Sequence, residues 1–252
     1  MQDAGQANQT PDSPRTYRLS TGHDVTLPLR SESSGFGAVF SFPRSTADEL
    51  LPDGLKPIRA TPRQAAVTIG FSRYHKVVGT DVKPYEEVGI IIPAVPDGNS
   101  TYPYISLLGH ATSGYIWYLP VTTKPAKALG VDVWDYPKEV VEIDAMIDDE
   151  CGRVCASKDG EEILSLQVST PSTFQVSDTS PAYTTIDGAI RRADIAFDGQ
   201  LGVRPFSTAV SISFGSHPKV VPLRNESVGG RALLRYGFEA ETEFYDHEAM
   251  NQ

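Results

Sequence analysis

The sequence has few cysteines and no long apolar run. Its 252 residues include only two cysteines, Cys151 and Cys155, which excludes a scaffold held by several disulfides. Their C-x3-C spacing has no second pair of ligands, so it is only a weak indication of zinc. No apolar run approaches the roughly 20 residues that a membrane-spanning helix requires. The segment 1–15 is polar and lacks the apolar stretch of a secretion signal. We therefore expect a cytoplasmic protein with no membrane partner.

Basic charge is also scarce. The chain has 22 Lys and Arg against 32 Asp and Glu, a net charge of −10, and no basic run. Nucleic-acid binding generally requires a basic patch, so a nucleic-acid partner is not expected. The nucleophile-elbow, zinc-protease and phosphate-loop motifs are absent, and the five histidines show no ligand spacing. We expect neither a metal nor a cofactor.

Glycine and proline are plentiful and separate short apolar runs. The 21 glycines and 19 prolines punctuate the chain in the manner of a protein with many strands and turns. The predicted strands are 37–42, 66–74, 88–95, 104–108, 114–119, 141–147, 153–157 and 163–169, with others near 206–213 and 231–245. The run 88–95 is nearly all apolar, which predicts a strand buried on both faces. An Asp-Gly pair at 159–160 predicts a hairpin.

Helical patterns are few and short. Residues 45–52 have a capping-box-like start and a proline stop, and Lys124 to Leu129 precedes Gly130, which we interpret as a helix C-cap. We predict a mainly β fold (β-rich α+β): an antiparallel sheet, closed or nearly closed into a barrel or cone, with short helices outside. Residues 1–15 are expected to form a disordered tail and 16–252 a single domain.

Lys138 has apolar and aromatic neighbours in the sequence that favour a nucleophilic amine. Lys138 follows Pro137 in a segment that also contains Trp134 and Tyr136. Burial disfavours the charged form of a lysine, and the neutral amine is a nucleophile towards carbonyl groups. Most lysines are solvated, however, so these neighbours alone leave an ordinary surface lysine as the alternative.

The surrounding pattern resembles a known Schiff-base region. Pro125, Ala126, Ala128, Gly130, Tyr136, Pro137 and Lys138 fit, without a gap, the segment around the reactive lysine of the acetoacetate decarboxylase family. The resemblance implies that Lys138 forms the imine with substrate. It also implies the family's β-rich fold and a homo-oligomer. Exposed edge strands and the apolar run 88–95 favour the same assembly.

Two upstream segments extend the resemblance to about residues 30–247. The stretch 85–93 is similar to the family segment that supplies an active-site carboxylate, which places Glu87 in that role. The triplet 42–44 is similar to the segment of the arginine that pairs with this carboxylate, which places Arg44 there. By this resemblance Arg44 orients Glu87, and Glu87 moves protons. The alternative from the residues alone is a structural ion pair.

The chain also departs from the family. Glu139 stands where the family has a second lysine, and 71–74 has no counterpart of a further family acid. A glutamate close to Lys138 would favour the charged amine, unless it points away. Trp117, Tyr118 and Trp134 are candidate walls of the substrate pocket, with Glu139 beside them. Their alternative is ordinary core.

Three functions follow from these features. The first is decarboxylation of a small β-keto acid through an iminium on Lys138, with Glu87 and Arg44 assisting. The second is a pyruvate-type aldolase-dehydratase that uses the same lysine. The third is a non-catalytic barrel that binds a small carboxylate, in which Lys138 is only a charge partner.

Overall fold

A computed structural model describes residues 14–98, 114–148 and 150–250. The predicted strand 104–108 and most of the predicted tail lie outside these ranges. Arg15, the last residue of the predicted tail, already begins a strand that pairs with 24–27. None of the helices within the described ranges is long and apolar enough to cross a membrane.

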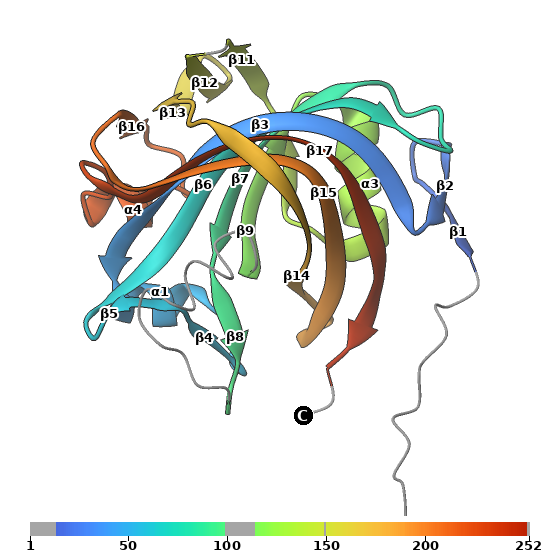
Figure 1. The fold of residues 1–252 in the computed structure, drawn as a ribbon. Coiled ribbons are helices and arrows are strands. Elements are labelled where there is room, and N and C mark those ends of the chain that lie inside the picture. The colour runs from blue at the N-terminus through green and yellow to red at the C-terminus, as the bar shows by residue number, and fades with distance from the viewer. Residues whose placement is uncertain (1–13, 99–113, 149, 251–252) are drawn as a thin grey trace, which may run out of the picture.

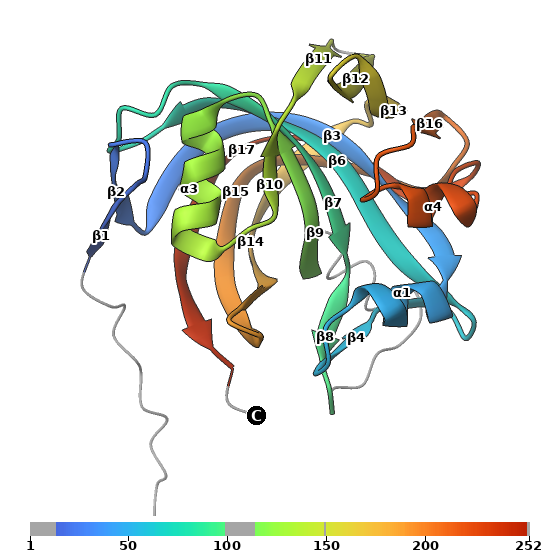
Figure 2. The same ribbon diagram turned by 180° about the vertical axis from the view of Figure 1, so that it is seen from behind.

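The fold is mostly β (Figures 1 and 2). Seventeen strands are assigned in the described residues: β1 Arg15–Arg18, β2 Asp24–Leu27, β3 Leu29–Pro43, β4 Leu55–Pro57, β5 Arg59–Thr61, β6 Gln64–Val77, β7 Tyr85–Ile92, β8 Ala94–Pro96, β9 Gly114–Val121, β10 Lys138–Val140, β11 Glu142–Ile147, β12 Cys151–Lys158, β13 Glu161–Ser169, β14 Thr173–Ile186, β15 Ala189–Ser207, β16 Val210–Phe214 and β17 Ala232–Ala249. The helices there are α1 Arg44–Leu50, α3 Lys124–Trp134 and α4 Val221–Asn225.

Strand pairings close the large sheet into a ring. The order runs β9, β14, β15, β17, β3, β6 and β7, and β7 pairs back to β9. This confirms the predicted mainly β fold with a closed or nearly closed sheet. The sheet is mixed rather than wholly antiparallel, because β9 pairs in parallel with both β14 and β10. Strand β10 sits at one end of the sheet, where β9 is its only partner within the described residues.

Two apolar clusters fill the two sides of this sheet. Strand β7 shows why, since its alternate residues point to opposite faces. Val88, Ile90 and Ile92 are fully buried in the larger cluster, while Tyr85 belongs to the cluster that contains α3. The apolar run 88–95 is thus used inside the monomer. It divides at Pro93, which cannot donate a ladder hydrogen bond.

A smaller sheet of β11, β12, β13 and β16 covers part of the larger cluster. The predicted hairpin at 159–160 is confirmed: Asp159 and Gly160 connect β12 to β13 with φ of 52° and 82°. Positive φ at both turn positions is the geometry that Asp-Gly favours, since it matches the twist of the strands. Cys151 and Cys155 are free thiols on β12.

Helix α3 packs against β10 and β17 (Figure 2). It begins where the side chain of Thr123 accepts a hydrogen bond from the backbone N–H of Ala126. The prediction that Gly130 ends this helix is wrong. The helix continues to Trp134, and Asp135 ends it in the left-handed conformation with φ 53°. Gly130 instead lies inside the helix, in contact with the side chain of Lys138.

Candidate active site

The site centres on a buried pair of opposite charges. Lys138 begins β10 and Glu87 lies on β7, on the other side of β9. The Nζ of Lys138 is 2.7 Å from Oε2 of Glu87, and only 5% and 11% of these side chains are exposed. Within the described residues, Oε2 has no hydrogen-bond donor besides this ion-pair contact. The structure therefore brings together two of the three predicted catalytic residues.

Gly130 gives Lys138 its path to Glu87. A Cβ added at Gly130 would lie 2.3 Å from Cε and 2.5 Å from Cδ of Lys138, far inside normal contact. The aliphatic chain of the lysine thus runs across the helix backbone, where only glycine leaves room. The glycine eight positions before the lysine is a packing requirement of the site.

Three buried tyrosines gather around Glu87. The ring of Tyr74 stacks on that of Tyr85 with centroids 4.5 Å apart, and the Tyr74 hydroxyl lies 3.5 Å from Oε1 of Glu87. The ammonium of Lys138 lies 5.5 Å from the centroid of Tyr85. Tyr136 lies two residues before the lysine, and the negative charge of Glu87 raises its pKa. Its hydroxyl has no hydrogen-bond partner among the described residues.

These tyrosines remain protonated over the physiological range. Burial is the main cause that raises the pKa of Tyr74, Tyr85 and Tyr136, and the negative charge of Glu87 raises each further. A protonated phenol is a hydrogen-bond donor. Among the described residues, the Tyr136 hydroxyl is therefore a buried donor without an acceptor.

The arrangement suits reactions of a carbonyl compound. Glu87 is positioned to take a proton from the ammonium of Lys138, which frees the amine to attack a carbonyl carbon. Little water reaches either group, so hydrogen bonds and charges act strongly on a bound substrate. Within the described residues, no group of three or more His, Cys, Asp or Glu could hold a metal.

Glu139 does not line this site. Consecutive residues of a strand point to opposite faces. Glu139 accordingly contacts Tyr118, His217 and Lys158, and Tyr118 belongs to the larger apolar cluster. The prediction that Glu139 binds substrate beside Lys138 is not supported by this orientation. The carboxylate of Glu139 thus points away from the amine of Lys138.

Arg44 also lies elsewhere. It begins α1, 43% of its side chain is exposed, and its ion-pair partner is Asp48 at 3.4 Å. The strand before it ends opposite Gln64 of β6, whereas Glu87 pairs with Ser72 of β6. These positions are eight residues apart (72 − 64 = 8), roughly 26 Å along the strand. The predicted pairing of Arg44 with Glu87 is wrong, because Glu87 pairs with the lysine.

The three aromatic residues predicted as pocket walls divide between the two faces. Trp134 is buried in the cluster around α3 and stacks on Tyr136 with centroids 5.6 Å apart, so it backs the site. Trp117 and Tyr118 pack with the larger cluster, away from Lys138. The indole N–H of Trp117 donates to the carbonyl of Lys219.

Sequence reasoning missed part of the site. Tyr85 could have been found, because it lies two residues before Glu87 on a strand and so shares its face. Tyr136 stands in the lysine motif, which predicts it as a neighbour of Lys138 but does not predict that it lies near Glu87. Tyr74 carries no local signal; strand pairing places it opposite Tyr85.

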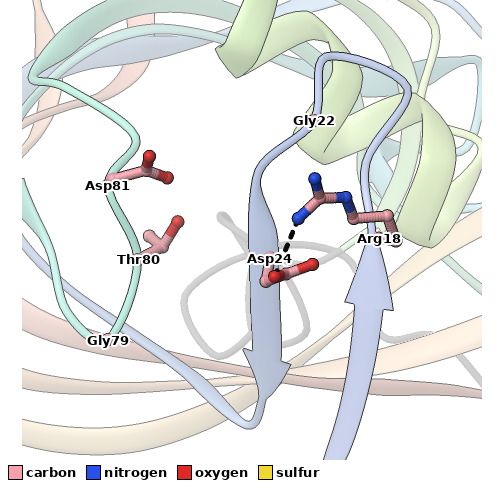
Figure 3. A pocket seen from close by; sticks show the side chains of 6 residues that line it. All are labelled: Arg18, Gly22, Asp24, Gly79, Thr80 and Asp81. Carbon is pink, nitrogen blue, oxygen red and sulfur yellow. Dashed lines mark hydrogen bonds and ion pairs between the residues drawn. The ribbon is translucent and has the colours of Figure 1, made fainter.

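A separate hollow lies on the surface beside the β1–β2 hairpin (Figure 3). It is lined by Arg18, Gly22, Asp24 and the loop 79–81, and Arg18 pairs with Asp24 at 2.8 Å. None of the predicted site residues lines it. Its polar, open lining does not suit imine chemistry, which a dry site favours.

Comparison with known proteins decides the family. The family model described as acetoacetate decarboxylase matches residues 13–185. The chain belongs to the acetoacetate decarboxylase family. This match includes Glu87 and Lys138, and it confirms the resemblance seen in the sequence. No curated protein sequence matches the chain.

Solved structures of acetoacetate decarboxylase-like proteins share the fold. An acetoacetate decarboxylase from Legionella pneumophila is 10% identical, with a TM-score of 0.62 over 98% of this chain and 93% of its own. Another acetoacetate decarboxylase is 15% identical, with a TM-score of 0.62 over 88% and 89%. The enduracididine biosynthesis enzyme MppR, complexed with pyruvate, is 14% identical, with a TM-score of 0.64 over 95% and 99%. At these identities the likeness shows a common fold.

Proposed function

We propose that this protein is a Schiff-base lyase that acts on a small keto acid through Lys138. The observation that carries the proposal is the buried contact of 2.7 Å between Lys138 and Glu87. A structural role alone explains this pair poorly, since burying two charges costs about as much as their attraction returns. Membership in the acetoacetate decarboxylase family supports the same conclusion.

The chemistry begins with the lysine amine. Lys138 transfers a proton to Glu87, and its nitrogen forms a bond to the ketone carbon. Protonation and loss of the former carbonyl oxygen as water leave an iminium cation. In a β-keto acid, the bond between the α-carbon and the carboxylate then breaks and CO2 departs. The electron pair of this bond forms a carbon–carbon double bond, and the π electrons of the iminium move to nitrogen. The resulting enamine takes a proton at carbon, and water releases the ketone and restores the amine.

In this scheme, Tyr136 donates a hydrogen bond to the substrate. Its free hydroxyl is suited to donate to the ketone oxygen, or to the carboxylate, of an acid bound beside Lys138. This buried donor has no acceptor among the described residues, and a buried donor without an acceptor costs free energy.

A second reaction starts from the same iminium. With pyruvate, the iminium loses a proton to give an enamine, whose carbon attacks an aldehyde. Loss of water leaves the condensation product bound to Lys138 as an iminium, and hydrolysis releases it and restores the amine. The structure of MppR with the condensation product of pyruvate and imidazole 4-carboxaldehyde, 12% identical, keeps this candidate open for a chain of the same fold. We place decarboxylation first, because the matching family model is that of the decarboxylase.

Borohydride trapping tests the proposal. The protein is incubated with acetoacetate or with pyruvate, reduced, digested and analysed by mass spectrometry. We expect a reduced adduct on Lys138, and CO2 release with acetoacetate supports the decarboxylase. A pyruvate adduct without CO2 release supports the aldolase-dehydratase. No adduct with either acid would favour the barrel that only binds a carboxylate.

Two variants make the trapping specific. Lys138→Met should abolish the adduct. Lys219→Met is the matched control, because Lys219 is another partly buried lysine: burial lowers its pKa, and its ammonium lies over the ring of Trp117 at 4.3 Å. It should still form the adduct. An adduct that disappears in Lys219→Met and persists in Lys138→Met would overturn the assignment of the lysine.

A further inference from the structure

Lys138 lies on a short edge strand with few backbone hydrogen bonds to the sheet. Strand β10 has three residues and lies at the end of the large sheet, and in the part of the chain that the structure describes it pairs only with β9. That pairing is parallel, which is slightly weaker per residue than an antiparallel one. Backbone hydrogen bonds join its flanks to β9, from Leu119 to the carbonyl of Pro137 and from Val141 to the carbonyl of Val121. So short an edge strand needs side-chain contacts to fix its rotation.

Glu139 makes these contacts on the face opposite the site. Its carboxylate accepts a hydrogen bond from the hydroxyl of Tyr118 on β9 and from Nζ of Lys158 at the end of β12, and it lies 3.2 Å from Nε2 of His217 after β16. Side chains from two strands and one loop thus hold the carboxylate of Glu139. Burial raises the pKa of Glu139, but the bonds from Lys158 and Tyr118 outweigh it, so the pKa is lowered overall.

His217 is itself oriented for this contact. Its Nδ1 accepts a hydrogen bond from the backbone N–H of Lys219 at 3.3 Å, which leaves the proton of a neutral ring on Nε2, facing Glu139. Its ring also stacks on Tyr118, with centroids 5.1 Å apart. The group of Tyr118, Lys158 and His217 around Glu139, which we term the Glu139 clamp, is therefore a connected unit.

We propose that Glu139 is a positioning residue: the Glu139 clamp fixes the rotation of β10 so that Lys138 points across Gly130 to Glu87. Adjacent residues on a strand have opposite directions, so holding one side chain sets the direction of the next. The activity readout of this inference rests on the proposed imine chemistry, whereas its structural readout does not.

The chain contains a matched control on β7. Glu86 precedes Glu87 as Glu139 follows Lys138, and its ion pair with Arg73 is similarly placed, with 20% of the Glu86 side chain exposed against 26% for Glu139. Strand β7 is paired on both sides, with β6 and β9. Its backbone is thus fixed without the ion pair, and loss of that pair should leave Glu87 in place.

The experiment compares Glu139→Ala with Glu86→Ala. The rate of borohydride trapping is measured over a range of acetoacetate and pyruvate concentrations, and a crystal structure of each variant records the Lys138–Glu87 distance. We expect the saturating rate to fall about tenfold or more in Glu139→Ala, at little change in half-saturating concentration, because misplacement of a reacting group by about 1 Å is costly. The ion-pair contact should be lost there and retained in Glu86→Ala.

Each outcome decides the inference. Glu139→Gln, which keeps an oxygen acceptor for Tyr118, should recover much of the rate. Equal loss of rate in both alanine variants, or an unchanged Lys138–Glu87 distance in Glu139→Ala, would overturn the positioning role. If the unmodified protein traps neither acid but the contact is lost only in Glu139→Ala, the positioning role holds and the proposed chemistry fails.

Discussion

The side chain of Lys138 crosses the backbone of Gly130 so closely that a Cβ there would lie 2.3 Å from Cε. This contact explains why a glycine occurs inside α3, where it is a poor helix former. The helix backbone acts as one wall of the path that leads the amine to Glu87. A residue that sequence reasoning assigns to a helix end is thus part of the site.

Gly130→Ala should therefore separate activity from stability. The atoms that must move are the far end of a flexible side chain, and alanine favours the helix by about 1 kcal/mol. We expect helix content by circular dichroism and the unfolding midpoint to be retained, while the trapping rate falls by about tenfold or more. Lys127→Ala, on the exposed side of the same helix, should leave the rate unchanged. Equal rates in both variants would show that Lys138 reaches its position by another path.

The buried pair should be costly for stability. Lys138→Met or Glu87→Leu alone leaves one buried charge without its partner, and each should lower the free energy of unfolding by about 3–5 kcal/mol. The double variant leaves no unpaired charge and should return to within about 1 kcal/mol of the unmodified protein, or exceed it. Urea unfolding measures all three. Additive losses in the double variant would mean that Lys138 and Glu87 contribute to stability independently and are not coupled as a pair.

Tyr136→Phe should remove a donor that the folded protein leaves unpaired. Because the buried hydroxyl has no partner among the described residues, its removal should leave stability unchanged or raise it by about 1 kcal/mol. Trapping of a keto acid should slow by about tenfold if the hydroxyl contacts the substrate. Tyr236→Phe, at another buried tyrosine on β17, is the control and should keep the rate. An unchanged rate in Tyr136→Phe would exclude its hydroxyl from the reaction.

Alkaline pH should lower the free energy of unfolding. The ordinary pKa of tyrosine is 10.0, and burial raises the pKa of Tyr74, Tyr85 and Tyr136 in the folded chain. Stability is therefore complete below pH 10 and is lost as the pH rises towards the raised values, because only the unfolded chain releases these protons. The loss should approach about 1.4 kcal/mol per pH unit for each tyrosine. Urea unfolding from pH 9 to pH 11, about one unit either side of that value, should show a shallower slope in Tyr136→Phe. An equal slope would mean that Tyr136 ionises in the folded protein.

Arg44→Ala should have little effect. The residue contributes an exposed pair with Asp48 one helical turn away, which is typically worth about 0.3–0.5 kcal/mol. Because Arg44 pairs with Asp48, whereas Glu87 pairs with Lys138, its loss should not change the activation free energy, and we expect the trapping rate to remain within about twofold of the unmodified protein. A loss of about a hundredfold would restore Arg44 to the site and require a rearrangement of α1.

The sequence determined the features that depend on neighbours along the chain. Gly and Pro spacing predicted a mainly β fold, Asp159 and Gly160 predicted their hairpin, and the lysine motif marked Lys138. Each of these signals is local, because turn geometry and strand alternation are set within a few residues. Glu87 was found in the same way, by a short motif on one strand.

The tertiary structure decided which residues meet. That Glu87 pairs with Lys138 and not with Arg44 follows from the register of β6 and β7, which local patterns do not set. The direction of Glu139 follows from the pairing of β10 with β9, and the part played by Tyr74 from its position opposite Tyr85. Such contacts depend on strands far apart in the chain that closing the sheet brings side by side. The sequence alone therefore predicted Lys138 as the site lysine, and only the closed sheet selected its partners.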